Sequence, residues 1–182
     1  SANTAVGFQA LKYNAVAKNT AVGHSAGLNT TGTLNTYVGA SAGIGGSGAD
    51  ANNVGVGASA LAAITDGTNN ISIGSGSSIG LKGGDENVSV GSNSLASIVD
   101  TDNNVAIGNH SLRSLAGSAD NVSIGTQSSR YMYGGSNVVI GKDALKGATF
   151  TEGGGTYNDD PTITHTADAR IIAGLGVSGT GI

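Results

Sequence analysis

The sequence lacks cysteine and tryptophan, contains a single proline and is poor in aromatic and charged residues. Aromatic residues make up 4% and charged residues 11% of its 182 positions. Without cysteine the chain has no disulfide framework and no thiolate metal site. The scarcity of bulky side chains excludes an ordinary globular core, because there is too little large apolar volume to fill one.

The charge balance and the hydropathy pattern exclude two further classes. The formal net charge is −4, with 8 Lys and Arg against 12 Asp and Glu, so we expect no nucleic-acid partner. No apolar run approaches the ~20 residues of a membrane-spanning helix, so this segment is not expected to be embedded in a membrane. The low net charge and the regular spacing of Val and Ile also disfavour disorder.

What the sequence has in abundance is glycine, 32 residues, arranged in a repeat. The pattern Asn-x-x-(Val/Ile)-Gly recurs nine times at intervals of 16–18 residues. The repeated asparagines are Asn3, Asn19, Asn35, Asn53, Asn70, Asn87, Asn104, Asn121 and Asn137. Helical repeats need roughly 33 residues or more. Short β-branched runs followed by Gly instead predict an all-β fold, a parallel β-solenoid of nine coils stacked about 4.8 Å apart.

Reading the repeats as columns assigns positions to faces. We expect the residue before each glycine to form the apolar core of the coil, together with the residue two positions earlier on the same strand face. The core column is Val6, Val22, Val38, Val56, Ile73, Val90, Ile107, Ile124 and Ile140. The column between them is uncharged and, apart from Tyr37 and Val139, consists of Ala, Ser and Gly; it is expected to contact other subunits. Leu11, Leu61, Leu95, Leu112 and Leu145 add bulk to the core.

The asparagine column is expected to form a ladder of side-chain hydrogen bonds between coils. The alternative is that each Asn adopts a left-handed turn conformation. Both interpretations make the asparagines structural.

The motif resembles the left-handed parallel β-roll head repeats of trimeric autotransporter adhesins, most closely at residues 104–108 and 121–125. The opening run Asn3–Leu11 resembles the longer repeats of phage tail fibres and related bacterial surface fibres. The resemblance covers residues 3 to about 147 and implies a parallel homotrimeric fibre, extracellular, on a cell surface or virion tail. We therefore expect a shaft or head over 1–147, and a Gly/Thr-rich linker or the start of a further trimeric module over 148–182. Because the first motif begins at residue 3 without a cap, we expect a segment of a longer fibre.

No catalytic, metal or cofactor site is expected. His24, His110 and His165 share no locus, so they are interpreted as surface residues. Five acids precede successive asparagines at offsets too irregular for a calcium-binding roll, which favours turn-forming roles; these are Asp50, Asp66, Asp85, Asp102 and Asp120. No Ser/His/Asp constellation has a plausible scaffold, so an enzyme is the least favoured class.

The candidate binding patch is Arg130, Tyr131 and Tyr133, in a segment between strands where solenoid insertions project outward. Planar aromatics beside an arginine suit contacts with a cell-surface glycan or protein receptor. The alternative is that they cover a corner of the coil or a neighbouring chain. The sequence thus predicts a structural and adhesive fibre segment for attachment to host or prey cells. An ice-binding or other non-adhesive solenoid is the alternative, although Thr4, Thr20 and Thr36 are expected to face inward.

Overall fold

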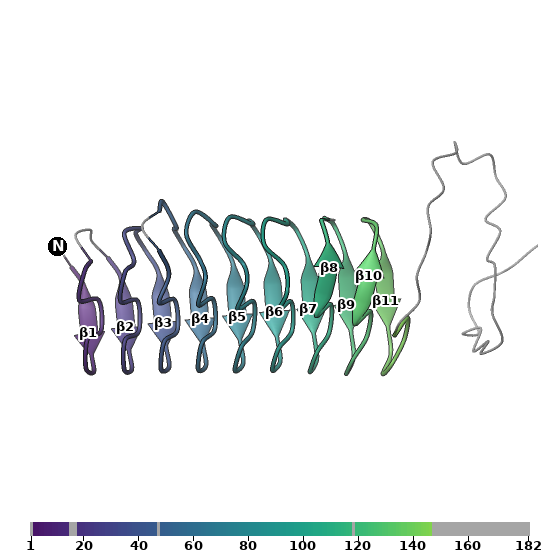
Figure 1. The fold of residues 1–182 in the computed structure, drawn as a ribbon, viewed down its shortest axis with the longest axis horizontal. Coiled ribbons are helices and arrows are strands. Elements are labelled where there is room, and N and C mark those ends of the chain that lie inside the picture. The colour runs from purple at the N-terminus through teal and green to yellow at the C-terminus, as the bar shows by residue number, and fades with distance from the viewer. Residues whose placement is uncertain (1, 15–17, 47, 118, 147–182) are drawn as a thin grey trace, which may run out of the picture. The chain divides into compact units, whose positions relative to one another are not determined.

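The computed structural model describes residues 2–14, 18–46, 48–117 and 119–146. The linker or module expected at 148–182 lies outside them. The described chain is an all-β parallel solenoid of about eight turns (Figure 1). Within these ranges it forms only strands and turns, so none of it is a helix long and apolar enough to cross a bilayer.

Nine three-residue strands form one parallel sheet in sequence order. They are β1 (Thr4–Val6), β2 (Thr20–Val22), β3 (Thr36–Val38), β4 (Val54–Val56), β5 (Ile71–Ile73), β6 (Val88–Val90), β7 (Val105–Ile107), β9 (Val122–Ile124) and β11 (Val138–Ile140). Each strand pairs in register with the next, as Val88 with Val105, so equivalent repeat positions stack along the axis. A second parallel pair joins β8 (Ser114–Ala116) to β10 (Tyr131–Tyr133).

The glycine that ends each main-sheet strand is required by the backbone and by the adjacent turn. Gly91 has φ +135°, a conformation that side-chain-bearing residues rarely adopt. A Cβ placed on Gly91 would lie 2.5 Å from the carbonyl oxygen of Gly108, the equivalent glycine of the next turn. The column is therefore glycine because the turns approach too closely there for any side chain.

The asparagine column forms a continuous ladder. Each backbone N–H donates to the Oδ1 of the preceding ladder asparagine, at 2.8 Å from Asn19 to Asn3 and at 3.1 Å from Asn137 to Asn121. The side-chain Nδ2 groups donate to carbonyls of the returning segment, as from Asn87 to Thr101 at 2.7 Å. The left-handed conformation falls one residue earlier, at positions such as Lys18 (φ 68°). The asparagines therefore tie the start of each strand to the neighbouring turn.

The assignment of strand faces made from the sequence is wrong. From β2 onward the middle residue of each main-sheet strand is buried in the interior, with Ala21 and Ala106 fully buried, whereas Val6 (57% exposed), Ile73 and Ile140 of the expected core column face outward. The same holds for the column as a whole, whose members are all intermediate or exposed: Val6, Val22, Val38, Val56, Ile73, Val90, Ile107, Ile124 and Ile140.

The physical reason is the narrowness of the coil beside the main sheet. The corner that follows each strand returns at once, so the middle strand residue directly contacts the small corner residue five positions later. The Oγ atoms of Ser89 and Ser94 lie 2.6 Å apart. Seven of the nine main-sheet strands have Ala, Ser or Gly at this position, and the larger core side chains come mostly from the next segment. The predicted burial of Leu11, Leu61, Leu95 and Leu112 is confirmed, and Leu145 packs partly buried against this core.

Tyr37 and Val139 are the two larger residues in the small interior column, and Tyr37 is the bulkier. It was expected at a subunit contact, but its side chain is fully buried inside the coil. Glycines make room for its ring, since a Cβ on Gly43 would lie 2.3 Å from Tyr37 Cε1 and one on Gly55 would lie 3.0 Å from Tyr37 Cδ1. The two glycines therefore leave the space that the Tyr37 ring fills.

Candidate interaction surfaces

The outward first and third residues of the nine main-sheet strands make up a surface that we call the outer sheet face. It contains only Val, Ile and Thr. Its exposed members include Val22, Ile71, Ile107 and Val138, with 71% of Val138 accessible. Because equivalent residues stack in register, they form two continuous columns along the axis, one of Val and Ile throughout and one that is Thr in β1–β3 and Val or Ile from β4 onward.

The three threonines at the start of this face differ from the expectation. Thr4, Thr20 and Thr36 occupy the first position of their strands and so share the outer sheet face with Val22 and Val38, instead of facing inward. The reason is the same reversal of faces that places the small middle residues inside. From β4 onward Val or Ile replaces Thr in this column.

The candidate patch lies at and before β10. Tyr131 is 46% exposed, and the guanidinium carbon of Arg130 lies 5.3 Å from the centroid of its ring. Arg130 Nη1 also donates to Gln127 Oε1 at 3.3 Å. Between the two tyrosines, Met132 is buried in the core, as the alternation of a strand requires. The side chain of Tyr133 lies outside the described part of the structure.

Two residues that the patch prediction omitted lie beside it. Arg113 precedes β8 as Arg130 precedes β10, and Ser114 N donates to the Arg130 carbonyl at 3.0 Å, which places the two arginines on adjacent turns. Burial lowers the pKa of His110, and the positive charges of Arg113 and Arg130 lower it further. The shared repeat position of the arginines, five residues after the glycine, is a sequence signal that could have identified Arg113.

The described residues hold no group of three or more His, Asp or Glu side chains placed to bind a metal ion. His24 stacks against Phe8, with ring centroids 5.3 Å apart, whereas His110 lies near the other end of the coil. His165 lies outside the described ranges. The two described histidines are thus not brought together.

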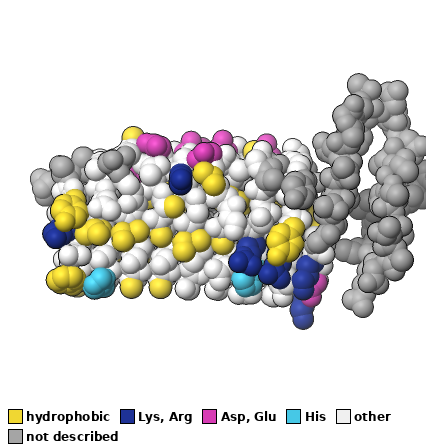
Figure 2. Space-filling model, in the orientation of Figure 1, with side chains coloured by type: hydrophobic (Ala, Val, Ile, Leu, Met, Phe, Trp, Pro, Cys, Tyr) yellow, Lys and Arg dark blue, Asp and Glu magenta, His cyan; other side chains and the backbone are white. Residues whose placement is uncertain are grey.

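Most of the acidic side chains visible in Figure 2 gather along one edge, opposite the main cluster of Lys and Arg side chains, while Asp143 pairs with Lys146. Their carboxylates accept backbone N–H groups of the preceding turn: Asp66 from Ala49 at 3.1 Å, and Asp102 from Asp85 at 2.9 Å. Asp85 likewise accepts from the backbone N–H of Thr68 at 2.6 Å. These bonds support the expected turn-forming role. They also leave an acidic edge and a basic edge on one chain whose net charge is only −4.

Comparison of the chain with protein-family models, with curated proteins and with solved structures found no match.

Proposed function

We propose that this chain is the structural and adhesive segment of a homotrimeric extracellular fibre, a phage tail fibre or a bacterial surface adhesin. Its coils would form a shaft of nine 16–18-residue repeats, whose surface binds a cell-surface glycan or protein receptor. The mechanism would be geometric, because a rod of three parallel chains repeats each weak contact three times and gains avidity.

The outer sheet face carries this proposal. Parallel sheets are normally covered on both faces, and here the coil covers only the inner one. The outer face presents two uncharged columns over nine strands, a stripe roughly 38 Å long at ~4.8 Å per strand. A stripe of this kind, apolar in both columns from β4 onward and in one column throughout, marks a surface that another molecule covers.

A second copy of the same chain is the occupant that fits this face. The repeat spacing of an identical chain matches it turn for turn, so Val and Ile columns meet equivalent columns along the whole length. Rods that pack side by side with their axes parallel are related by cyclic symmetry. The number three comes from the resemblance of the motif to trimeric adhesin heads.

The proposal is tested by the mass of the protein in solution. The purified 17.6 kDa chain should give three times its own mass by light scattering. Ile73→Lys/Ile107→Lys places two charges on the outer sheet face and should yield monomers. The control Ile79→Lys/Val99→Lys alters two exposed apolar residues outside that face and should remain trimeric.

Far-UV circular dichroism of both variants separates lost assembly from lost folding. A wild-type chain that is folded and monomeric would refute the proposal, as would a trimer that persists when both charges are present. A trimer lost equally in the control would show that the outer sheet face is not the contact.

An ice-binding solenoid is a second candidate, favoured by the outward position of Thr4, Thr20 and Thr36. A flat threonine array is needed for this function, and the array here ends after three strands. We therefore expect no thermal hysteresis from the purified protein. Measured hysteresis that disappears in Thr20→Lys would favour this candidate over the fibre.

A further inference from the structure

Three cationic side chains occupy one repeat position on successive turns near the end of the described coil. Arg113, Arg130 and Lys146 each lie five residues after the glycine of their repeat, and we call them the basic ladder. The backbone bond from Ser114 to Arg130 aligns the first two turns, and the bond from Ser129 N to the Ala144 carbonyl (2.8 Å) aligns the third. Consecutive cations are therefore spaced by about one turn, ~4.8 Å.

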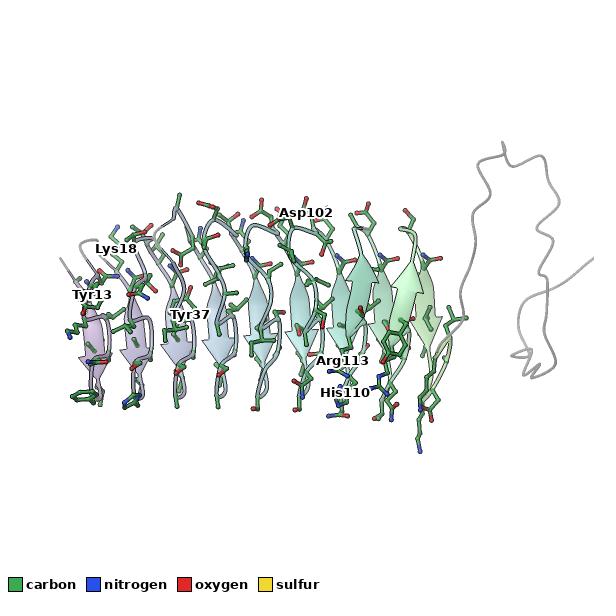
Figure 3. All side chains as sticks on the ribbon, viewed as in Figure 1. Tyr13, Lys18, Tyr37, Asp102, His110 and Arg113 are labelled. Atoms are coloured by element: carbon green, nitrogen blue, oxygen red, sulfur yellow. The ribbon has the colours of Figure 1, made fainter. Side chains whose placement is uncertain are left out.

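Neither arginine forms an ion pair with any of the described residues. The only ion pair among the described residues joins Lys146 to Asp143, at 3.1 Å. Arg130 Nε is buried and has no hydrogen-bond partner in the described part of the chain. Burial lowers the pKa of His110, and the positive charges of both arginines lower it further, so both arginines act on the same neighbouring side chain. Figure 3 shows His110 and Arg113 together on one edge of the coil, away from Asp102.

An exposed aromatic ring completes the surface. Tyr131 is 46% exposed, and its ring lies against the Arg130 guanidinium. A planar ring beside fixed cations offers one face to the apolar side of a sugar and directs N–H donors toward its acidic groups. Arginine pairs with sulfate-like and carboxylate groups through two parallel hydrogen bonds, which gives the contact direction as well as charge.

We propose that the basic ladder and Tyr131 form a binding site for an anionic polysaccharide, whose sulfate or carboxylate groups pair with Arg113 and Arg130 while a sugar ring lies on Tyr131. The inference rests on the proposed adhesive function and names its ligand class. A linear glycan fits because its charges can follow the ladder along the axis. Duplex nucleic acid fits less well, because three cations are few for a phosphate lattice and the acidic edge of the same coil repels it.

The test measures binding of the full chain to immobilised heparin, which is sulfated and carboxylated. Hyaluronan, which carries only carboxylates, and neutral dextran are the comparison arms. Heparin should bind in a salt-dependent manner and dextran should not, while the hyaluronan signal separates carboxylate from sulfate recognition. Arg113→Gln/Arg130→Gln should weaken heparin binding by about tenfold or more, and Tyr131→Ala should weaken it at every salt concentration.

The matched control is Lys12→Gln/Lys82→Gln, which removes the same charge elsewhere. Lys12 occupies the ladder's repeat position and lies 5.0 Å from the centroid of Tyr13, but the next turn has Leu28 there, so it is an isolated copy of the motif. The control should bind heparin within about twofold of wild type, because it leaves the ladder's charge-assisted pairs intact. Equal losses in both double variants, no loss in the arginine variant, or tighter binding of duplex DNA than of heparin would overturn the inference.

The solution mass keeps this test separate from the fibre proposal. A trimer that binds neither heparin nor hyaluronan would refute the glycan site but would be consistent with the proposed trimeric shaft. A monomer that binds heparin through Arg113 and Arg130 would refute the fibre and leave the glycan site standing.

Discussion

The hydroxyl of Tyr37 donates a 2.9 Å hydrogen bond to Oδ2 of Asp50, and both side chains are buried inside the coil. The same oxygen accepts from Asn35 Nδ2 at 2.9 Å, while Oδ1 accepts from the backbone N–H of Gly32 at 3.1 Å. Burial raises the pKa of Asp50 above its usual 3.8, although the bond from Tyr37 lowers it in part. The pair occupies the longest repeat interval, 18 residues, where the returning segment has length to spare.

Because the pKa of Asp50 is raised in the folded state, the protein should become less stable as pH rises through that pKa. The folded state holds the Asp50 proton more tightly than the unfolded state, so this contribution to stability is complete below pH 3.8 and is lost as pH rises through the raised pKa. Asp50→Asn should remove that part of the pH dependence. Urea unfolding of both proteins from pH 3 upward, at one protein concentration, should show the wild type losing stability relative to Asp50→Asn as pH rises. A relative gain of the wild type with rising pH would show that the sign is wrong.

Removing the Tyr37 hydroxyl should shift the pH range over which Asp50 affects stability. Tyr37→Phe keeps the ring between Gly43 and Gly55 but deprives the Asp50 carboxylate of a donor. The pKa of Asp50 should rise further, moving the loss of stability to higher pH, and near neutral pH the variant should lose about 1–3 kcal/mol of unfolding free energy. Tyr13→Phe, which alters an exposed ring, is the control and should leave the free energy unchanged.

The asparagine ladder makes an interior asparagine indispensable. Asn87 Oδ1 accepts from the backbone N–H of Asn104 at 3.0 Å, and its Nδ2 donates to Thr101 O at 2.7 Å. Asn87→Ala removes the partner of the Asn104 N–H and the partner of the Thr101 carbonyl. The loss of both hydrogen bonds should lower the unfolding free energy by about 3 kcal/mol. The exposed Asn109→Ala should cost at most about 0.5 kcal/mol in the same urea titration. Comparable losses would mean that the ladder does not stabilise the coil.

Alanine variants in the glycine column can distinguish backbone strain from steric contact between adjacent turns. Gly91→Ala introduces a Cβ 2.5 Å from Gly108 O, whereas Gly141→Ala has a similar φ of +132° and, among the described residues beyond its chain neighbours, its Cβ would approach no atom nearer than 3.7 Å. Gly91→Ala should therefore cost about 2 kcal/mol or more beyond Gly141→Ala. Gly117→Ala, with φ +60° and nothing within 4 Å, tests strain alone. Equal melting temperatures for the first two variants would show that the turns can separate.

The His110 titration reports the basic ladder directly. Its pKa lies below 6.5 because of burial and the two neighbouring arginines, so Arg113→Gln should raise it. Since the folded state disfavours the charged ring, His110 contributes stability that is complete above pH 6.5 and is lost as pH falls from there through its lowered pKa in the folded state. Proton NMR of the His110 ring measures the shift. Lys82→Gln should leave it unchanged, and an equal effect from that variant would indicate a general charge effect.

Much of the architecture could be predicted from the repeat. The Asn-x-x-(Val/Ile)-Gly pattern predicted a parallel solenoid with equivalent positions stacked, which the nine-stranded sheet confirms. The burial of Leu61 and Leu95 also followed from their column. These features depend only on periodicity, because a fixed interval brings the same position to the same place on every turn.

Contacts that occur in one turn and do not recur in the others could not be predicted from the repeat. Nothing in the columns pairs Tyr37 with Asp50, because each departs from its column and the two meet only through the longer return segment. The grouping of Arg113 and His110 with Arg130 likewise depends on which side chains the turns direct to one edge. The binding role of Arg130, Tyr131 and Tyr133 stays a prediction.

The sequence by itself determined the period, the strands, the register and the two alternating faces of each strand. Only the tertiary structure decided which face is inside. Alternation defines two sides but not the concave one, and bulk is a misleading guide in so thin a coil. The tight corner after each glycine leaves interior room beside Ala106 for a methyl group, so Val105 and Ile107 face outward, where the proposed neighbouring chain would cover them.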